Sequence, residues 1–237
     1  MKKRIISLIL ILTTLLSLAL FVACEEEEVI DDEYLILVNK ENAVGDDYVP
    51  EELVTIDASY TTGGKLIQLN KTALDALILM LDAMKEDGIT NVTVTSAYRT
   101  YDYQKKLFEG YIAAESAAHP DWSEDKVREQ VLTYSAAPGT SEHQTGLCVD
   151  LFTNQMEGLY NYGDETPKNP WDKGFAETQA YEWLCENAYK YGFILRFPEN
   201  KTNVTGYSYE SWHYRYVGVD HATKIHEQNL TLEEYLK

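Results

Sequence analysis

Two short segments, far apart in the chain, gather the groups from which a metal-dependent catalytic site can be built. The first runs from Ser141 to Asp150 and the second from Glu210 to His213. Together they supply two imidazoles and two carboxylates: His143, His213, Asp150 and Glu210. A catalytic zinc ion needs three protein ligands, an open position for water and a nearby base. The two segments therefore predict a zinc site in a fold that brings them together, although their spacing alone is not unique to such sites.

The sequence around Asp150 has the alternation of a strand. Between Leu147 and Phe152, Asp150 shares one face with Cys148, and the opposite face is apolar and can pack into a core. Gly146 allows the backbone a sharp change of direction before this strand. Periodicity predicts a further strand at 92–96 and helices at 72–86, 101–118, 123–134 and 176–191. This mixture predicts an α+β fold, with helices packed around a small antiparallel sheet that carries the zinc site.

Both segments resemble the motifs of one family. Ser141 to Asp150 fits S-x-H-x-x-G-x-A-x-D except at Cys148, where the family usually has Ala, and Glu210 to His213 resembles E-P-W-H, with Ser211 in place of Pro. The chain thus resembles the VanY-type D-alanyl-D-alanine carboxypeptidases, zinc peptidases that are related to the lysostaphin and hedgehog domains. The resemblance spans roughly residues 39–218 and includes three further segments in the family's order: Ser96–Thr100, Tyr191–Arg196 and Trp212–Gly218.

The resemblance implies a role for each matched residue. It implies three zinc ligands: His143, Asp150 and His213. Glu210 would be the base that takes the proton of the zinc-bound water, and Arg99 would bind the scissile carbonyl. Gln104 and Ser141 resemble positions that bind the terminal carboxylate of the substrate, although a helix-surface amide and a loop hydroxyl are equally compatible with the sequence. The Cys148 thiol, next to Asp150 on the same strand face, fits as a small buried side chain, although a thiolate at this position could compete as a zinc ligand or be oxidised.

The family resemblance also implies the reaction. We expect a zinc carboxypeptidase that removes the C-terminal D-alanine from peptidoglycan stem peptides, by D,D- or L,D-cleavage. One alternative is an endopeptidase that cuts within the stem peptide or cross-bridge. Another is a zinc-containing module that binds the cell wall without turnover, but such a module would have no need of a base such as Glu210.

The N-terminal residues predict export and membrane attachment. Residues 1–23 place three cations before a long apolar run, which is typical of a secretory signal. Phe21–Cys24 resembles a lipobox, so Cys24 is expected to receive a lipid, with an uncleaved membrane anchor as the alternative. Residues 24–33 read as an acidic spacer and 34–237 as the catalytic domain, which would open with an edge strand at 34–38. The expected location is outside the cytoplasm of a bacterium, on the membrane.

Charge and cysteine content narrow the possible partners. The 237-residue chain has a formal net charge of −19, which argues against nucleic acid as a partner because phosphate binding needs Lys and Arg surfaces. With Cys24 assigned to lipid, Cys148 and Cys185 remain, and they could form a disulfide or stay as two buried thiols.

Overall fold

The computed structural model describes residues 32–154 and 174–237. The predicted signal peptide at 1–23, the predicted lipidation site Cys24 and nearly all of the acidic spacer predicted at 24–33 lie outside these residues. Within the described residues, no helix combines the length and apolar character needed to cross a membrane.

A four-stranded antiparallel sheet carries the two predicted segments side by side. Its strand order is β3–β4–β6–β5, with bounds Val92–Ser96, Cys148–Thr153, Glu210–Tyr216 and Phe193–Phe197. Asp150 on β4 lies opposite His213 on β6 and also opposite Ser96 on β3. The predicted antiparallel sheet and α+β class are therefore confirmed, and pairing of β4 with β6 brings together residues that are far apart in the sequence.

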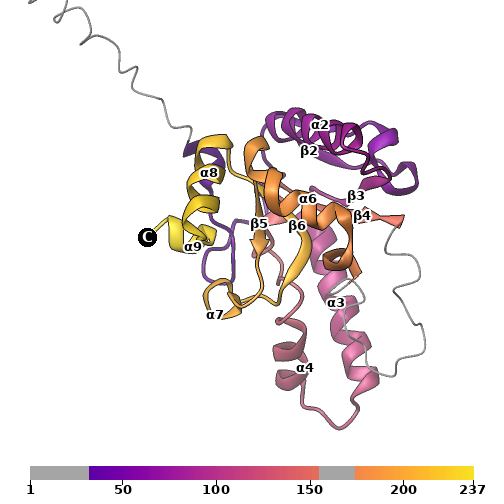
Figure 1. The fold of residues 1–237 in the computed structure, drawn as a ribbon. Helices are drawn as coiled ribbons and strands as arrows, with labels where there is room; N and C mark the ends of the chain where they lie inside the picture. Colours follow the sequence, from indigo (N-terminus) through magenta and orange to yellow (C-terminus); the bar gives the residue numbers. More distant parts are fainter. Residues whose placement is uncertain (1–31, 155–173) are drawn as a thin grey trace, which may run out of the picture. The chain divides into compact units, whose positions relative to one another are not determined.

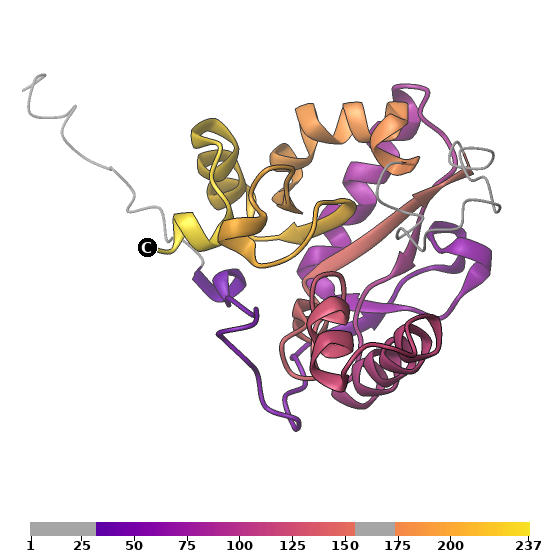
Figure 2. The ribbon, with the colours of Figure 1, turned by 90° about the horizontal axis from the view of Figure 1, so that it is seen from below.

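The apolar core lies on one face of this sheet. Val149 and Leu151, which alternate with Asp150 along β4, are fully buried in a cluster that includes one side of helix α2 (Lys71–Glu86). Helix α6 (Gln179–Asn187) contributes Leu184 to the same cluster. Figure 1 shows α2 on one side of the sheet and the pair α3 (Tyr101–Ala118) and α4 (Glu124–Val131) on the other, which Figure 2 shows from below. Asp150 is thereby held by a strand whose opposite face is anchored in the core.

The helices begin where the sequence offers capping side chains. The Asn70 carboxamide oxygen accepts hydrogen bonds from the first turn of α2, and the Thr100 hydroxyl caps α3 in the same way. Thr231 and Glu234 form a reciprocal capping box at the last helix.

The remaining elements are short or C-terminal: η1 Asp32–Leu35, β1 Leu53–Thr55, η2 Ala58–Tyr60, η3 Thr62–Gly64, β2 Gln68–Asn70, η4 Glu142–Thr145, η6 Phe175–Glu177, η7 Ala188–Tyr191, α7 Thr202–Thr205, α8 Val219–Gln228 and α9 Leu232–Tyr235.

Two local predictions were wrong. The expected edge strand at 34–38 is a 3₁₀ turn followed by irregular chain, because the carbonyl groups of Tyr34 and Ile36 accept hydrogen bonds from the buried Arg215 guanidinium instead of a neighbouring strand. The expected helix at 176–191 is divided into η6, α6 and η7. The disulfide alternative is also excluded, since Cys148 and Cys185 are both free. The alternative of two buried thiols is confirmed for Cys148 and wrong for Cys185, which is exposed.

Gly146 performs the predicted change of direction. It ends the 3₁₀ turn η4, which carries His143, and its φ of +67° lies in the left-handed region that favours glycine. A Cβ at this position would lie 2.9 Å from the Leu53 side chain. The chain therefore turns from η4 into β4 within a space that only glycine fits without rearrangement.

Candidate metal centre

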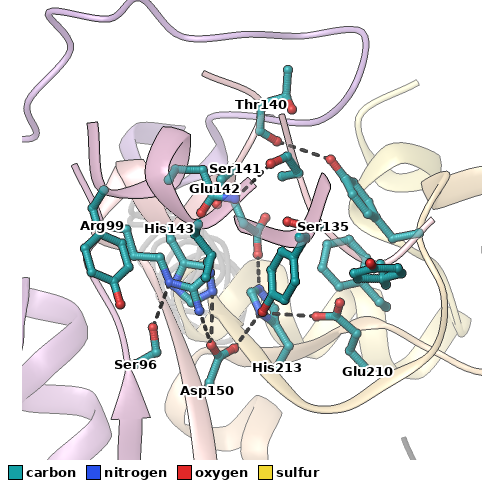
Figure 3. Close-up of a pocket in the computed structure, with 18 of the residues that line it drawn as sticks. Ser96, Arg99, Ser135, Thr140, Ser141, Glu142, His143, Asp150, Glu210 and His213 are labelled. Atoms are coloured by element: carbon teal, nitrogen blue, oxygen red, sulfur yellow. Dashed lines mark hydrogen bonds and ion pairs between the residues drawn. The ribbon is translucent and has the colours of Figure 1, made fainter. Parts of the chain in front are cut away.

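The residues predicted for the site line one cavity of about 930 Å³. This cavity is bounded by β4, β6, the turn η4 and one side of α3. Figure 3 shows how the imidazoles and carboxylates from these elements converge. All predicted site residues within the described chain line it: Arg99, Gln104, Ser141, His143, Asp150, Glu210 and His213.

Each imidazole is held through one nitrogen and presents the other to Asp150. His143 Nδ1 donates to the carbonyl oxygen of Ala97 at 2.6 Å, since a carbonyl can only accept. His213 Nε2 lies 2.7 Å from Oε1 of Glu142, whose carboxylate accepts. The opposite nitrogens, His143 Nε2 and His213 Nδ1, lie 3.3 and 2.9 Å from the two oxygens of Asp150. Anchoring of the second ring nitrogen is the arrangement that orients histidine ligands in metal sites.

This set of donors fits a metal ion. His213 Nδ1 and Asp150 Oδ1 both present lone pairs at 2.9 Å, which repel unless a proton or a metal ion lies between them. Two imidazole nitrogens and a carboxylate oxygen are typical ligands of zinc. The Cys148 thiol is a further donor on this side of β4. Its sulfur and one nitrogen of each imidazole all lie within 4.8 Å of one another.

Glu142 is a candidate site residue that the two motifs did not predict. Its carboxylate is buried and accepts from His213 on one oxygen and from Arg196 Nε and Arg215 Nη1 on the other, at 2.8 and 3.1 Å. Burial disfavours its charge, but the two guanidinium groups outweigh burial and hold the pKa of Glu142 well below its usual range. The signal was present in the sequence, since Glu142 adjoins His143 and both arginines lie in segments that match the family.

Arg196 extends this network to the C-terminal helix. Its Nη1 and Nη2 donate to the Glu233 carboxylate on α9 at 2.9 and 2.6 Å, and Asn39 Nδ2 donates to the same carboxylate at 3.2 Å. Two buried arginines thus face two buried glutamates behind His213. Because a buried charge is costly unless it is paired, the network fixes each member in place.

Figure 3 shows Arg99 and Glu210 on opposite sides of the imidazole pair. Glu210 Oε2 is 3.6 Å from His213 Nδ1. Burial raises the pKa of Glu210 to about 7; the charge of His213 lowers this pKa, and the charge of Asp150 raises it further. Arg99 donates from Nη2 to Asp150 at 2.7 Å and from Nε to the Ser96 hydroxyl at 2.8 Å. A carboxyl group that titrates near neutral pH is suited to proton transfer.

Gln104 is buried rather than displayed on a helix surface. Its Nε2 donates to the carbonyl of Ala136 at 2.8 Å, and its Oε1 has no hydrogen-bond partner among the described residues. Ser141, which precedes η4, is also buried and faces the same cavity. Both positions are therefore compatible with the predicted contact to substrate.

Comparison with known proteins identifies the same family over most of the chain. The family model described as VanY, D-alanyl-D-alanine carboxypeptidase, matches residues 66–219. The putative carboxypeptidase YodJ of Bacillus subtilis (strain 168) is 38% identical over 205 residues, which cover 86% of this chain and 67% of YodJ. The D-alanyl-D-alanine carboxypeptidase of Enterococcus faecalis (strain ATCC 700802 / V583) is 36% identical over 85% of this chain. The chain spans about two-thirds of the length of these curated relatives.

Two solved structures support the comparison. A vancomycin-resistance D,D-pentapeptidase VanY from a VanB-type cassette, in complex with Zn(II), has a TM-score of 0.66 and 36% identity, with 86% of this chain and 99% of that chain covered. The LD-carboxypeptidase LdcB has a TM-score of 0.68 and 37% identity, with 84% of each chain covered. These matches confirm the resemblance inferred from the two motifs and, for the family, the α+β fold, the hydrolase class and zinc.

Proposed function

We propose that this chain, which belongs to the VanY D-alanyl-D-alanine carboxypeptidase family, is a zinc carboxypeptidase that removes the C-terminal D-alanine from peptidoglycan stem peptides. One observation carries the proposal. Two anchored imidazoles present their free nitrogens to Asp150 in the wall of a cavity, with the Glu210 carboxyl group 3.6 Å from one of them. A non-catalytic module needs no titratable carboxyl group at that position.

Asp150 is the third ligand in this proposal, with His143 and His213, and Cys148 is not. Asp150 lines the cavity, whereas the Cys148 side chain is fully buried and is not part of the cavity wall. A hydrolytic zinc ion needs an open position that faces the substrate. Zinc held by His143, Asp150 and His213, which all line the cavity, would keep its fourth position facing the substrate.

The residues around the metal centre perform different steps of peptide hydrolysis in this proposal. Bound zinc would lower the pKa of its water from about 15.7 to about 7 and polarise the scissile carbonyl. Glu210 takes a proton from the attacking water and delivers it to the leaving amine. Arg99 has Nη1 free of partners among the described residues, and its fixed positive charge can stabilise the developing oxyanion. Gln104 and Ser141 hold the terminal carboxylate of the substrate.

The decisive experiment follows the loss of alanine by mass spectrometry. Two defined muropeptides, one ending in D-Ala-D-Ala and one already shortened by one residue, are incubated with residues 34–237, with and without a chelator. Loss of one alanine that stops on chelation and returns with zinc is the expected result, and the substrate that reacts assigns D,D- or L,D-cleavage. If a protein with stoichiometric zinc trims neither peptide, the proposal is wrong.

We also propose that the enzyme works outside the cytoplasm while tethered to the membrane through a lipid on Cys24. The support is the resemblance of Phe21–Cys24 to a lipobox and the acidic residues that follow it. Metabolic labelling with a fatty acid should mark the full-length protein in membranes, and Cys24→Ser should remove the label. Equal labelling of the two proteins would refute the lipid anchor.

A further inference from the structure

The cavity continues beyond the metal centre along one side of α3. Gln104, Tyr111 and Glu115, spaced by seven and four residues, lie on the same side of this helix and line the cavity. Ala114 and Ala118 also line it, and their small side chains leave room beside Glu115. From Gln104 to Glu115 the helix rises about 16 Å. A cavity of this length accommodates more than the terminal residue of a peptide.

Glu115 is a buried carboxylate in the distal part of this cavity. Its side chain is 10% exposed, and Oε1 accepts a hydrogen bond from the Tyr134 hydroxyl at 2.9 Å. His119 Nε2 lies 3.6 Å from Oε2, beyond hydrogen-bond distance. In the part of the chain that the structure describes, no lysine or arginine nitrogen lies within 4.0 Å of Glu115. Buried glutamates are normally paired with a cation, and among the described residues only His119, which is charged only when protonated, lies within 4.0 Å of this carboxylate.

Aromatic rings connect Glu115 with the metal centre. Tyr111 and Tyr134 pack edge to face, with ring centroids 5.5 Å apart, and both line the cavity. Tyr111 is also close enough to Arg99 and Asp150 for their charges to act on its hydroxyl group. The faces of tyrosine rings attract cations. A positive group that reaches Glu115 from the metal centre therefore meets favourable surroundings along its path.

We propose that Glu115 and Tyr134 form a subsite for the primary ammonium group of a diamino-acid residue in the peptide substrate, a proposal that rests on the carboxypeptidase function above. The Tyr134 hydroxyl occupies Oε1, whereas Oε2 accepts no hydrogen bond and has only His119 Nε2 at 3.6 Å, so the carboxylate suits a compact ammonium better than a guanidinium, which binds both oxygens. An extended peptide advances about 3.3 to 3.6 Å per residue. Two or three residues and one long side chain therefore span the roughly 16 Å that separates Gln104 from Glu115 along the helix.

The test compares two peptides that end in D-alanine and differ only in one residue, lysine or Nε-acetyl-lysine. The wild-type enzyme should have a kcat/KM about tenfold higher for the lysine peptide, because acetylation removes the charge that Glu115 binds. Glu115→Gln should lower kcat/KM for the lysine peptide about tenfold and remove the preference. Glu109→Gln, which removes an exposed carboxylate from the same helix, is the matched control and should keep the preference.

Binding distinguishes failure of the subsite from failure of the reaction. Isothermal titration calorimetry of both peptides with the zinc-loaded wild-type protein requires no turnover and no variant. Equal affinity for the two peptides overturns the subsite. Tighter binding of the lysine peptide without any loss of alanine supports the subsite and overturns the proposed reaction alone. A preference that survives in Glu115→Gln assigns the ammonium to another group and also overturns the subsite.

Discussion

Glu142→Gln tests whether the buried carboxylate behind His213 positions this residue for zinc. Glutamine keeps the size of the side chain but removes the charge that Arg196 and Arg215 share. Its amide can also turn an N–H toward either guanidinium or toward His213 Nε2. The substitution therefore weakens the hydrogen bond that makes Nδ1 the free nitrogen of His213.

The structure gives two separate magnitudes. Removal of one partner from a buried ion pair costs about 3 to 5 kcal/mol, because the other charge stays buried and uncompensated. For a domain of this size, such a loss lowers Tm by roughly 6 to 20 °C. Loss of the group that orients a histidine ligand lowers metal affinity by about 10- to 100-fold. The first effect belongs to the network as a whole, and the second belongs to the contact with His213.

Glu233→Gln is the matched control, because it removes the other carboxylate of the same network without touching His213. Zinc affinity is measured by competition with a chromophoric chelator, at a temperature where both variants are folded, and Tm is measured by circular dichroism. We expect both variants to lose stability and only Glu142→Gln to lose zinc affinity. If both bind zinc as tightly as wild type, Glu142 stabilises the fold but does not position the ligand.

Three further predictions concern the metal centre and the backbone. Asp150→Asn should abolish stoichiometric zinc and Cys148→Ala should retain it in metal analysis, whereas the opposite result would make the thiol the ligand. Zinc affinity should rise with pH toward about 9, because burial opposes the charged form of His143 but Asp150 and Cys148 raise the pKa of His143 to about 9. Below that pH a proton competes with the metal for the imidazole nitrogen. An affinity that is constant from pH 6.5 to 9 would contradict this prediction. Gly192→Ala should cost about 1 to 3 kcal/mol in urea unfolding, because its φ is +81° and a Cβ would lie 2.7 Å from the Tyr216 ring; unchanged stability would refute the strain.

Local patterns predicted the elements whose residues repeat with a clear period. The strand at 92–96 and the helix at 101–118 have the predicted bounds, and the strand around Asp150 differs by one residue at each end. The apolar alternation of that strand also predicted which face enters the core. Such patterns depend only on side chains close in sequence, so they could be recognised without knowledge of the fold.

Strand β5, Phe193–Phe197, was not predicted. Its sequence has four apolar residues and one arginine, without an alternation of polar and apolar residues that would distinguish it from the preceding helix. The arginine, Arg196, is fully buried in the structure. The burial of Arg196 depends on its ion pairs with Glu142 and Glu233, which lie elsewhere in the chain. An ionic residue in the core has no local signal of its own, because only its distant partners make its burial possible.

The sequence by itself determined the family, the α+β class and the types of side chain available for zinc. Motifs, periodicity and side-chain chemistry depend only on the identity and order of the amino acids. The tertiary structure decided which nitrogen of each imidazole faces Asp150, through Ala97 and Glu142, and it placed Cys148 behind the cavity wall. It also brought Glu115 into the same cavity as the metal centre. These features depend on contacts between residues far apart in the chain, and such contacts exist only after the strands have paired and the helices have packed.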